Sequence, residues 1–234
     1  MHSKQNDSGR NRFVAFVDIL GFRDLVLRSP DLSDFSERYT RVFAPLEDEL
    51  QRYGILHRLF SDSLFLCVQH RALEQELRNL IMFCRSLLRR ATTASLPIRG
   101  SISFGRVIWN KNGDIIVGAP IIESVEYERI QNWVGIILAP TSTRYLAQKK
   151  DLMQNFVDER LLRKYRSVPV KGTPNTMSAL AIDFSFSEEE KNEQLTHALD
   201  NMGLQSGSSS ASFKYLNTIN FLEEAKAKPG SGAD

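Results

Sequence analysis

The chain has 234 residues and a mass of 26.6 kDa, with 30 Lys and Arg residues against 28 Asp and Glu residues. This near-neutral charge argues against a protein whose binding is dominated by nucleic-acid phosphates. No apolar run approaches the ~20 residues of a membrane-spanning helix, and the polar N-terminus lacks a secretory signal pattern. Cys67 and Cys84 are too few for a disulfide framework and are interpreted as buried packing residues. We therefore expect a cytoplasmic protein with neither a nucleic-acid nor a membrane partner.

Composition divides the chain into a main domain and an appendage. Polar residues predict disorder over 1–12 and 227–234, and the main domain is expected over 13–185. A helical appendage is predicted over 187–226, interrupted by a Gly- and Ser-rich stretch at 205–212. Its last part carries an apolar stripe that predicts packing on the domain or on a partner chain: Phe213, Leu216, Ile219 and Leu222.

The first half of the domain alternates between strand and helix patterns. Residues 13–18 are apolar on both faces, which predicts a central strand. Asp34 followed by Glu37 resembles a capping box that starts a helix, with an apolar stripe that continues to Leu50. Two short apolar runs on either side of a Ser-Asp-Ser turn predict a hairpin with strands at 55–60 and 64–68.

The second half predicts an amphipathic helix at 72–91 and a strand at 98–110 that ends in an Asn-Gly turn at 110–114. The remaining expected elements are a short strand to Gly118, a helix at 119–131, a strand at 133–138, helical segments to about 165, and strands at 167–171 and 177–184. The order strand, helix, hairpin, helix, strand predicts an α+β fold with a ferredoxin-like split βαβ core.

Two carboxylates occupy positions suited to phosphate chemistry. Asp18 closes the first strand and is followed by Gly21 and Phe22, whose amides could contact phosphate oxygens while the carboxylate holds a divalent cation. Asp62 lies in the hairpin turn. Taken singly, Asp18 could be a helix cap and Asp62 a turn former. In a split βαβ core, however, the first strand lies beside the hairpin, so the pair predicts a two-metal phosphoryl-transfer site.

Five segments occur in the order found in class III nucleotidyl cyclases, and over about 13–185 the chain resembles their catalytic domain: FVAFVDILGF (13–22), FSDSLFL (60–66), IRGSISFGRV (98–107), GAPIIESVEYE (118–128) and PVKGT (169–173). The short form with an abbreviated hairpin turn is similar to the bacterial pyrimidine cyclases of the Pycsar antiphage defence system. Those enzymes make cyclic UMP or cyclic CMP from UTP or CTP, with manganese or magnesium.

This resemblance implies roles for individual residues. Asp18 and Asp62 would hold two divalent ions (Mn²⁺ or Mg²⁺), with the backbone carbonyl of Ile19 as a third ligand. Lys171 would contact the β- and γ-phosphates of the nucleoside triphosphate, although it could also be a solvated lysine at the end of a strand. The resemblance further implies a separate effector that senses the cyclic nucleotide.

The positions that read the base in purine cyclases depart from the family pattern. They are Arg58 and Ile115 here, and an isoleucine cannot hydrogen-bond a purine edge. Arg58 shares strand parity with Asp62 and could face the same cavity. Tyr53 could narrow the pocket to the size of a pyrimidine, although a core tyrosine is the simpler interpretation.

The late helix also departs from the family, because Ile122 and Glu126 replace an asparagine and an arginine that stabilise the transition state. Arg129, on the same helical face as Glu126, is the candidate substitute, and Arg99 is the second candidate. A simple surface pair between Arg129 and Glu126 is the alternative. The late helix is expected to lie too far around the sheet to reach the same nucleotide as Asp18 within one chain. In the class III cyclases that the chain resembles, the partner's late helix completes the site, so the resemblance implies a head-to-tail homodimer with active sites at its interface.

The predicted function is a pyrimidine nucleotide cyclase with UTP favoured over CTP, since UTP is the commoner substrate of the family that it resembles. A catalytically degenerate nucleotide-binding module and a purine nucleotide cyclase are the alternatives. A diguanylate cyclase is disfavoured, because no Gly-Gly-Asp/Glu-Glu-Phe signature occurs at the hairpin.

Overall fold

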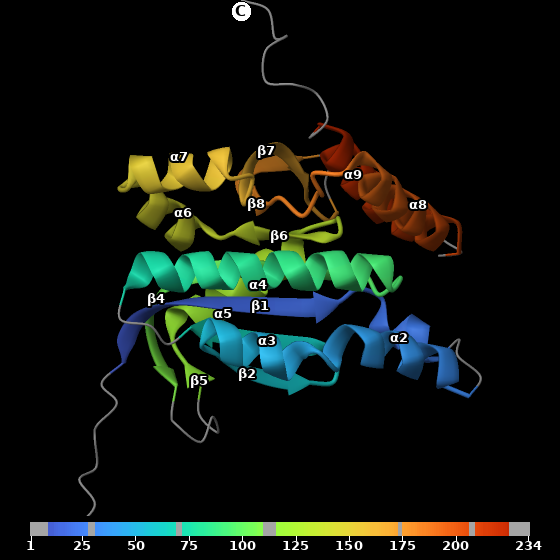
Figure 1. The fold of residues 1–234 in the computed structure, drawn as a ribbon, viewed down its shortest axis with the longest axis horizontal. Helices are drawn as coiled ribbons and strands as arrows, with labels where there is room; N and C mark the ends of the chain where they lie inside the picture. Colours follow the sequence, from blue (N-terminus) through green and yellow to red (C-terminus); the bar gives the residue numbers. More distant parts are fainter. Residues whose placement is uncertain are drawn as a thin grey trace, which may run out of the picture.

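The computed structural model describes residues 9–27, 31–68, 72–109, 116–172, 175–205 and 209–224. Within them, one eight-stranded sheet has the order β2-β3-β1-β4-β6-β8-β7, with β5 paired to β4 (Figure 1). The strands are β1 (Arg10–Ile19), β2 (Ile55–Phe60), β3 (Ser63–Val68), β4 (Ile98–Trp109), β5 (Ile116–Val117), β6 (Gly135–Leu138), β7 (Leu162–Pro169) and β8 (Thr176–Ile182). The helices are α1 (Phe22–Leu27), α2 (Ser33–Phe43), α3 (Leu46–Tyr53), α4 (Leu73–Thr93), α5 (Ala119–Ile130), α6 (Pro140–Ala147), α7 (Lys150–Asp158), α8 (Glu189–Gln205) and α9 (Ser209–Glu224).

The first four strands confirm the predicted split βαβ core. They lie in the order β2-β3-β1-β4, and each neighbouring pair is antiparallel. Along β1, Phe13 and Val17 point into the main core, which α4 covers, whereas Val14 faces the opposite side of the sheet together with Cys67. Asp18 has the same strand parity as Val14, so the candidate carboxylate lies on the face of the sheet opposite α4.

The second half of the chain extends this core by a parallel crossover. Strand β6 pairs with β4 in parallel after α5, and β8 and β7 continue the sheet with antiparallel pairing. The prediction that residues up to about 165 are helical is wrong, because β7 begins at Leu162. Its backbone groups pair with β8, with Leu162 opposite Ile182. This long-range pairing satisfies the strand hydrogen bonds and overrides the local helical pattern.

Two predictions near the N-terminus also need correction. The expected single helix is two helices, α2 and α3, separated at Ala44 and Pro45, because proline cannot donate the backbone hydrogen bond of a continuing helix. Helix α2 begins at Ser33, and the Ser33 amide donates a hydrogen bond to the Asp31 carboxylate at 3.0 Å. Asp34 lies inside the helix and is therefore not its cap.

Residues predicted to be disordered are partly ordered. Arg10 and Arg12 belong to β1, where they pair with Val107 and Gly105 of β4. Residues 1–8, the Asn-Gly turn, the middle of the Gly- and Ser-rich stretch and the last ten residues lie outside the described part of the chain. Cys67 and Cys84 are buried, as predicted, and both are free cysteines.

The C-terminal helices pack on the core of the domain. Phe221 of α9 is fully buried, with its ring 4.9 Å from those of Trp133 and Tyr165. Ile219 and Leu222 pack on the core as predicted, but Phe213 and Leu216 are at least half exposed. The Val134 amide donates a hydrogen bond to the Thr218 hydroxyl, and Asn217 Nδ2 donates to the Asn132 carbonyl. These bonds fix the rotation of α9, which leaves the first turns of the predicted stripe at the surface.

Candidate active site

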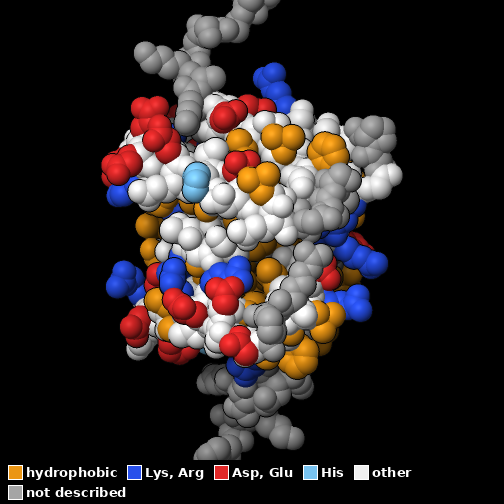
Figure 2. All heavy atoms as spheres, turned by 90° about the vertical axis from the view of Figure 1, so that its right-hand side faces the viewer, with side chains coloured by type: hydrophobic (Ala, Val, Ile, Leu, Met, Phe, Trp, Pro, Cys, Tyr) orange, Lys and Arg blue, Asp and Glu red, His pale blue; other side chains and the backbone are white. Residues whose placement is uncertain are grey.

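Strand β1 and the β2–β3 hairpin turn meet at one end of the sheet (Figure 1), on the side of the molecule that faces the viewer in Figure 2. Asp18 lies opposite Ser63 in the strand register, and the Ser63 hydroxyl donates a hydrogen bond to Asp18 Oδ1 at 2.9 Å. The next amide, that of Ile19, donates to the backbone carbonyl of Asp62 at 3.1 Å. The structure therefore brings together the residues that carry the two predicted carboxylates.

The electrostatic surroundings of Asp18 are unusual for a carboxylate. Burial raises the pKa of Asp18 to about 6, against the hydrogen bond from Ser63, and the negative charges of Glu128 and Asp62 raise it further. The positive charge of Arg99 acts in the opposite direction but does not cancel the shift. A cation bound beside Asp18 would offset both the cost of burying its negative charge and the repulsion between the carboxylates.

The donor set of this cluster fits a hard divalent cation. In the part of the chain that the structure describes, no three His, Cys, Asp or Glu side chains converge into a protein-only metal cage. Two carboxylates, with backbone and phosphate oxygens completing the shell, are the arrangement that Mg²⁺ commonly adopts with phosphate substrates. Asp18 and Asp62 would hold such an ion. The predicted third ligand, the backbone carbonyl of Ile19, directly follows Asp18 at the end of β1.

A buried ion pair lies beside Asp18, on the neighbouring strand and on α5. Arg99 is the register partner of Asp18 on β4, and its Nε atom is 2.7 Å from Glu128 Oε1 on α5. Arg99 Nη1 also donates to the Gln131 carbonyl at 2.7 Å, and both charged residues are about 95% buried. Arg99 thus lies at the predicted site, but Glu128 neutralises its charge. We did not predict this pair, although an arginine inside a buried strand requires a carboxylate partner.

Helix α5 is close to the site, which corrects the expectation that it is too far from Asp18. The hydroxyl groups of Ser101 and Ser103 on β4 donate to carbonyls of α5. The negative charge of Glu128 acts on Asp18 within the same chain. The physical reason is the crossover between the parallel strands β4 and β6, which returns α5 over the face of its own sheet.

Positive side chains collect next to this ion pair. The Lys171 amide donates to the Ile130 carbonyl at 2.8 Å, which places Lys171 beside Arg129 at the end of α5. Desolvation and the positive charges of Arg99, Lys214 and Arg129 lower the pKa of Lys171. Arg129 is exposed, and within the described residues it forms no ion pair with Glu126.

Lys214, in the second turn of α9, is a site residue that sequence reasoning missed. Its side chain is half-buried, and burial together with the positive charge of Arg99 lowers its pKa, while Asp24 on α1 acts in the opposite direction. Lys214 therefore lies between the ion pair and the segment that follows Asp18. The sequence around it gives no signal for this position, because α9 reaches the site only through its packing on the 132–134 loop.

The chain after Asp18 turns at Gly21 into the short helix α1, as the sequence predicted. Gly21 has a φ of 71°, in the left-handed region that favours glycine, and an added Cβ would meet no atom within 4 Å. Phe22 begins α1, where the first amides lack helical acceptors, and its ring contacts that of Phe35.

The predicted base-binding residues are dispersed. Arg58 lies on edge strand β2, opposite Phe65, on the same face of the sheet as Asp18 but two strands away from β1. Tyr53 immediately precedes β2, at the end of the hairpin opposite the Asp62 turn, so the structure does not bring it to the cluster. Ile115 lies outside the described residues.

Comparison with known proteins gives structural matches only. No protein-family profile matches the chain, and no curated protein matches its sequence. The chain is similar to the guanylate cyclase domain of RhGC from Catenaria anguillulae, solved with GTP, at 15% identity and a TM-score of 0.53, covering 74% of this chain and 95% of that one. The adenylyl cyclase CyaB from P. aeruginosa matches at 12% identity and a TM-score of 0.53, covering 77% and 97%.

A third solved structure, a non-canonical dimeric guanylyl cyclase domain of the RhoGC fusion protein from the aquatic fungus Blastocladiella emersonii, matches at 11% identity and a TM-score of 0.53, covering 74% of this chain and 95% of that one. These matches span most of the chain and nearly all of each neighbour. The similarity therefore covers the central sheet of this chain and the helices packed on it. No helix in the described residues is long and apolar enough to cross a bilayer. The chain has the α+β fold of the class III nucleotidyl cyclase catalytic domain.

Proposed function

We propose that this chain is a pyrimidine nucleotide cyclase that converts UTP, or CTP as the second choice, into the 3′,5′-cyclic nucleotide and pyrophosphate. One observation carries the proposal: in a cyclase fold, hydrogen bonds of Ser63 and Ile19 hold Asp18 next to the turn that contains Asp62. The cyclic nucleotide would serve as a second messenger in antiphage defence, read by a separate effector that senses it.

In the proposed reaction, the ribose 3′-hydroxyl loses its proton to solvent and its oxygen forms a bond to the α-phosphorus, while the bond from the α-phosphorus to the bridging oxygen breaks and pyrophosphate leaves. Divalent ions (Mn²⁺ or Mg²⁺) held by Asp18, Asp62 and the Ile19 carbonyl would lower the pKa of the 3′-hydroxyl and neutralise the triphosphate. The amides of Gly21 and Phe22 would bind phosphate oxygens in the turn after β1.

The cations near the carboxylates would bind and orient the triphosphate. Lys171 and Lys214 approach Arg99 from two different elements, and both keep part of their side chains accessible. Arg129, exposed at the end of α5, is the candidate for stabilising the charge that develops on the α-phosphate. Arg99 is the second candidate, and it would have to exchange Glu128 for phosphate to act directly.

Base selection is proposed to exclude purines. The two positions that would hydrogen-bond a purine are Arg58 and Ile115, and only the arginine is polar. Arg58 shares the sheet face of Asp18, which supports a role near the nucleotide. Tyr53 would have no part in base recognition, because it lies at the other end of the hairpin.

A degenerate nucleotide-binding module is the second candidate. It is supported by α5, in which Ile122 is 63% exposed and Glu126 is also exposed, where the cyclase family places transition-state groups. Such a protein would bind a nucleoside triphosphate through the same carboxylates and cations without turnover.

Incubation of the purified protein with each of the four nucleoside triphosphates and Mn²⁺ separates these functions. The expected result is cyclic UMP as the main product by chromatography and mass spectrometry, with equimolar pyrophosphate and less cyclic CMP. The Asp62→Ala variant is the negative control. A main product of cyclic AMP or cyclic GMP would establish purine specificity instead. Nucleotide binding without any cyclic product, in both Mn²⁺ and Mg²⁺, would identify the degenerate module.

The proposed assembly is a homodimer with active sites at its interface. Exposed apolar side chains on the hairpin and on α5 support an interface there: Phe60 is 80% exposed, and Leu59 and Ile122 are also exposed. A symmetric dimer that buried both elements would place the partner's α5 near each hairpin turn. Arg129 could then act on the partner's nucleotide, even though Glu128 lies near Asp18 within one chain.

Mixing two inactive variants tests this arrangement. Asp62→Ala and Arg129→Ala should each be nearly inactive, and an equal mixture should regain up to about a quarter of full activity if subunits exchange at random and the site is shared. This value follows because half of the dimers are mixed and each mixed dimer has one intact site. If labelled chains exchange but no activity returns, Arg129 acts within its own chain or not at all.

A further inference from the structure

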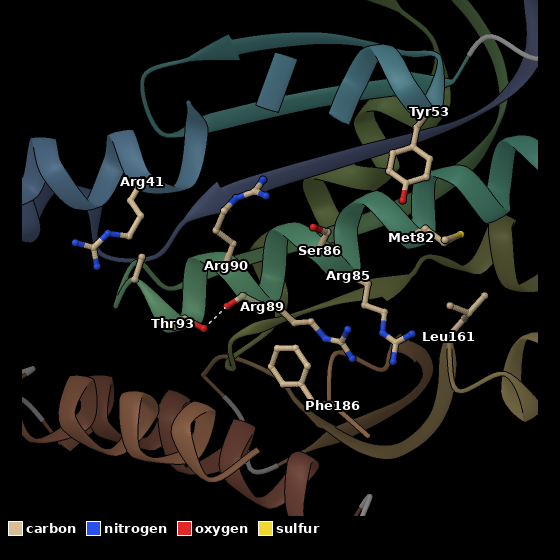
Figure 3. Close-up of a pocket in the computed structure, with 11 residues that line it drawn as sticks. Arg41, Tyr53, Met82, Arg85, Ser86, Arg89, Arg90, Thr93, Leu161 and Phe186 are labelled. Carbon is tan, nitrogen blue, oxygen red and sulfur yellow. Dashed lines mark hydrogen bonds between the residues drawn. The ribbon is translucent and has the colours of Figure 1, made fainter. Parts of the chain in front are cut away.

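A second cavity lies away from the carboxylate cluster, between α4, the ends of α2 and α3, and the segment around Phe186 (Figure 3). Its volume is about 570 Å³, within the range typical of small-molecule pockets. Its lining does not include Asp18, Asp62, Arg99 or Glu128, so it is not part of the candidate active site.

Arginine dominates the polar lining of this cavity. Arg41 and Arg90 have carboxylate partners, Glu37 and Glu49, each at 2.7 Å. Arg85 and Arg89 form no ion pair with any residue that the structure describes. Figure 3 shows both of their side chains directed from α4 towards the Phe186 segment.

The hydrogen bonds of Arg85 and Arg89 leave capacity for a ligand. Arg89 Nε donates to the Phe184 carbonyl at 2.9 Å, and Arg89 Nη2 donates to the Ser185 carbonyl, which also accepts from Arg85 Nη2 at 3.3 Å. Arg85 Nε has no hydrogen-bond partner among the described residues. A half-buried guanidinium that binds only carbonyl groups retains its full charge, which an approaching anion would stabilise.

The two guanidinium groups also repel each other. Burial and the nearby charge of Arg85 lower the pKa of Arg89 to about 10, and burial lowers the pKa of Arg85 as well. Arg160 adds to this repulsion, and the negative charges of Asp183 and Glu188 offset only part of it; Asp183 also pairs with Arg163 at 2.8 Å. A phosphate group would pair with both guanidiniums and remove this repulsion.

The rest of the lining is apolar and aromatic. Tyr53, Met82 and Leu161 contribute side chains to the wall, and Phe186 lies against the Arg89 guanidinium with its ring centroid 4.1 Å away. Aromatic rings next to two neighbouring guanidinium groups suit a ligand that has both a phosphate and a planar ring system.

We propose that this cavity is a second binding site for a phosphate-bearing ligand of nucleotide size, with the phosphate on Arg85 and Arg89 and the base and sugar against Tyr53 and Phe186. The site is independent of the proposed cyclase reaction, because it uses none of the residues assigned to that reaction.

The test uses uridine monophosphate and inorganic phosphate as probes, titrated separately into the full chain in EDTA and followed by calorimetry. EDTA removes the divalent ions that the carboxylate site would need. Uridine monophosphate should bind saturably and at least about tenfold more tightly than inorganic phosphate, because only the nucleotide also fills the apolar wall. Its binding should persist in Asp62→Ala.

Arg85→Gln and Arg89→Gln should each weaken binding of uridine monophosphate by about tenfold or more, the loss expected for a charge-assisted contact. Arg78→Gln is the matched control, since Arg78 lies on the same helix but pairs with Glu159 and does not line the cavity. Melting curves establish that each variant is folded. Arg85→Gln is the milder change, because it leaves both hydrogen bonds of Arg89 in place.

Three results would overturn the proposal. The first is the absence of saturable binding of either probe up to about 10 mM, a concentration that would detect even weak sites. The second is an equal loss of affinity in Arg78→Gln, which would identify nonspecific attraction to a basic surface. The third is equal affinity for inorganic phosphate and uridine monophosphate, which would exclude any role for the aromatic wall.

Discussion

Replacement of Asp18 by asparagine is expected to abolish cyclase activity and at the same time to stabilise the folded protein. Activity should fall by about a thousandfold or more, since a carboxylate ligand of the catalytic ions is lost. Stability should rise because Asp18 is half-buried and lies near the negative charges of Glu128 and Asp62, which together raise its pKa to about 6 and disfavour the ionised form that is present at neutral pH. Asparagine retains an acceptor for the Ser63 hydroxyl.

The stabilisation has a defined dependence on pH. The pKa of Asp18 rises from 3.8 to about 6 on folding, so the folded state binds more protons between these values. The destabilising effect of the charge is absent below pH 4, grows between pH 4 and 6, and is complete above pH 6. Asp18→Asn should therefore gain about 1–2 kcal/mol at pH 7, allowing for partial solvation of the group, and nothing at pH 4.

Thermal unfolding at both pH values measures this effect, with an expected rise in melting temperature of about 2–8 °C at pH 7. Asp48→Asn, an exposed carboxylate on α3, is the control and should leave the melting temperature unchanged. Added Mn²⁺ should stabilise the wild type but not Asp18→Asn. A variant that is less stable than the wild type at pH 7 would contradict the assigned repulsion, and retained activity would exclude Asp18 as a metal ligand.

Removal of the carboxylate of Glu128 should cause a large loss of stability. Glu128→Ala leaves the Arg99 guanidinium buried without its partner, for which the typical loss is about 3–5 kcal/mol in the free energy of unfolding. Urea denaturation measures this loss. Glu126→Ala, two residues earlier on α5 and exposed, is the control and should change stability by less than about 0.5 kcal/mol.

A double variant tests whether the unpaired charge or lost packing causes the instability of Glu128→Ala. Arg99→Met combined with Glu128→Leu removes both charges and should recover most of the stability lost in Glu128→Ala, because no buried charge remains unpaired. Activity should stay low if Arg99 also binds phosphate. Equal instability of the single and double variants would mean that packing, and not the unpaired charge, causes the loss.

The split βαβ core and the proximity of the two candidate carboxylates could both be predicted from local sequence patterns. Strand β1, the β2–β3 hairpin and α4 have strong local patterns, since their apolar periods are long enough to outweigh other influences. Asp18 and Asp62 were found because both are defined locally, one at a strand end and one in a tight turn. The split βαβ topology then places those two points together, which the hydrogen bond between Ile19 and Asp62 confirms.

The pairing of charged side chains, in contrast, depends on long-range packing and could not be predicted from the sequence. Arg99 and Glu128 are 29 residues apart, and Arg89 and Ser185 are 96 apart, so no periodicity relates them. Lys214 reaches the site through the packing of α9 on the 132–134 loop, and the β7 segment became a strand because β8 offered hydrogen-bond partners. Such contacts depend on how complete elements pack, and the free energy of pairing a buried charge is set by partners that local sequence does not identify.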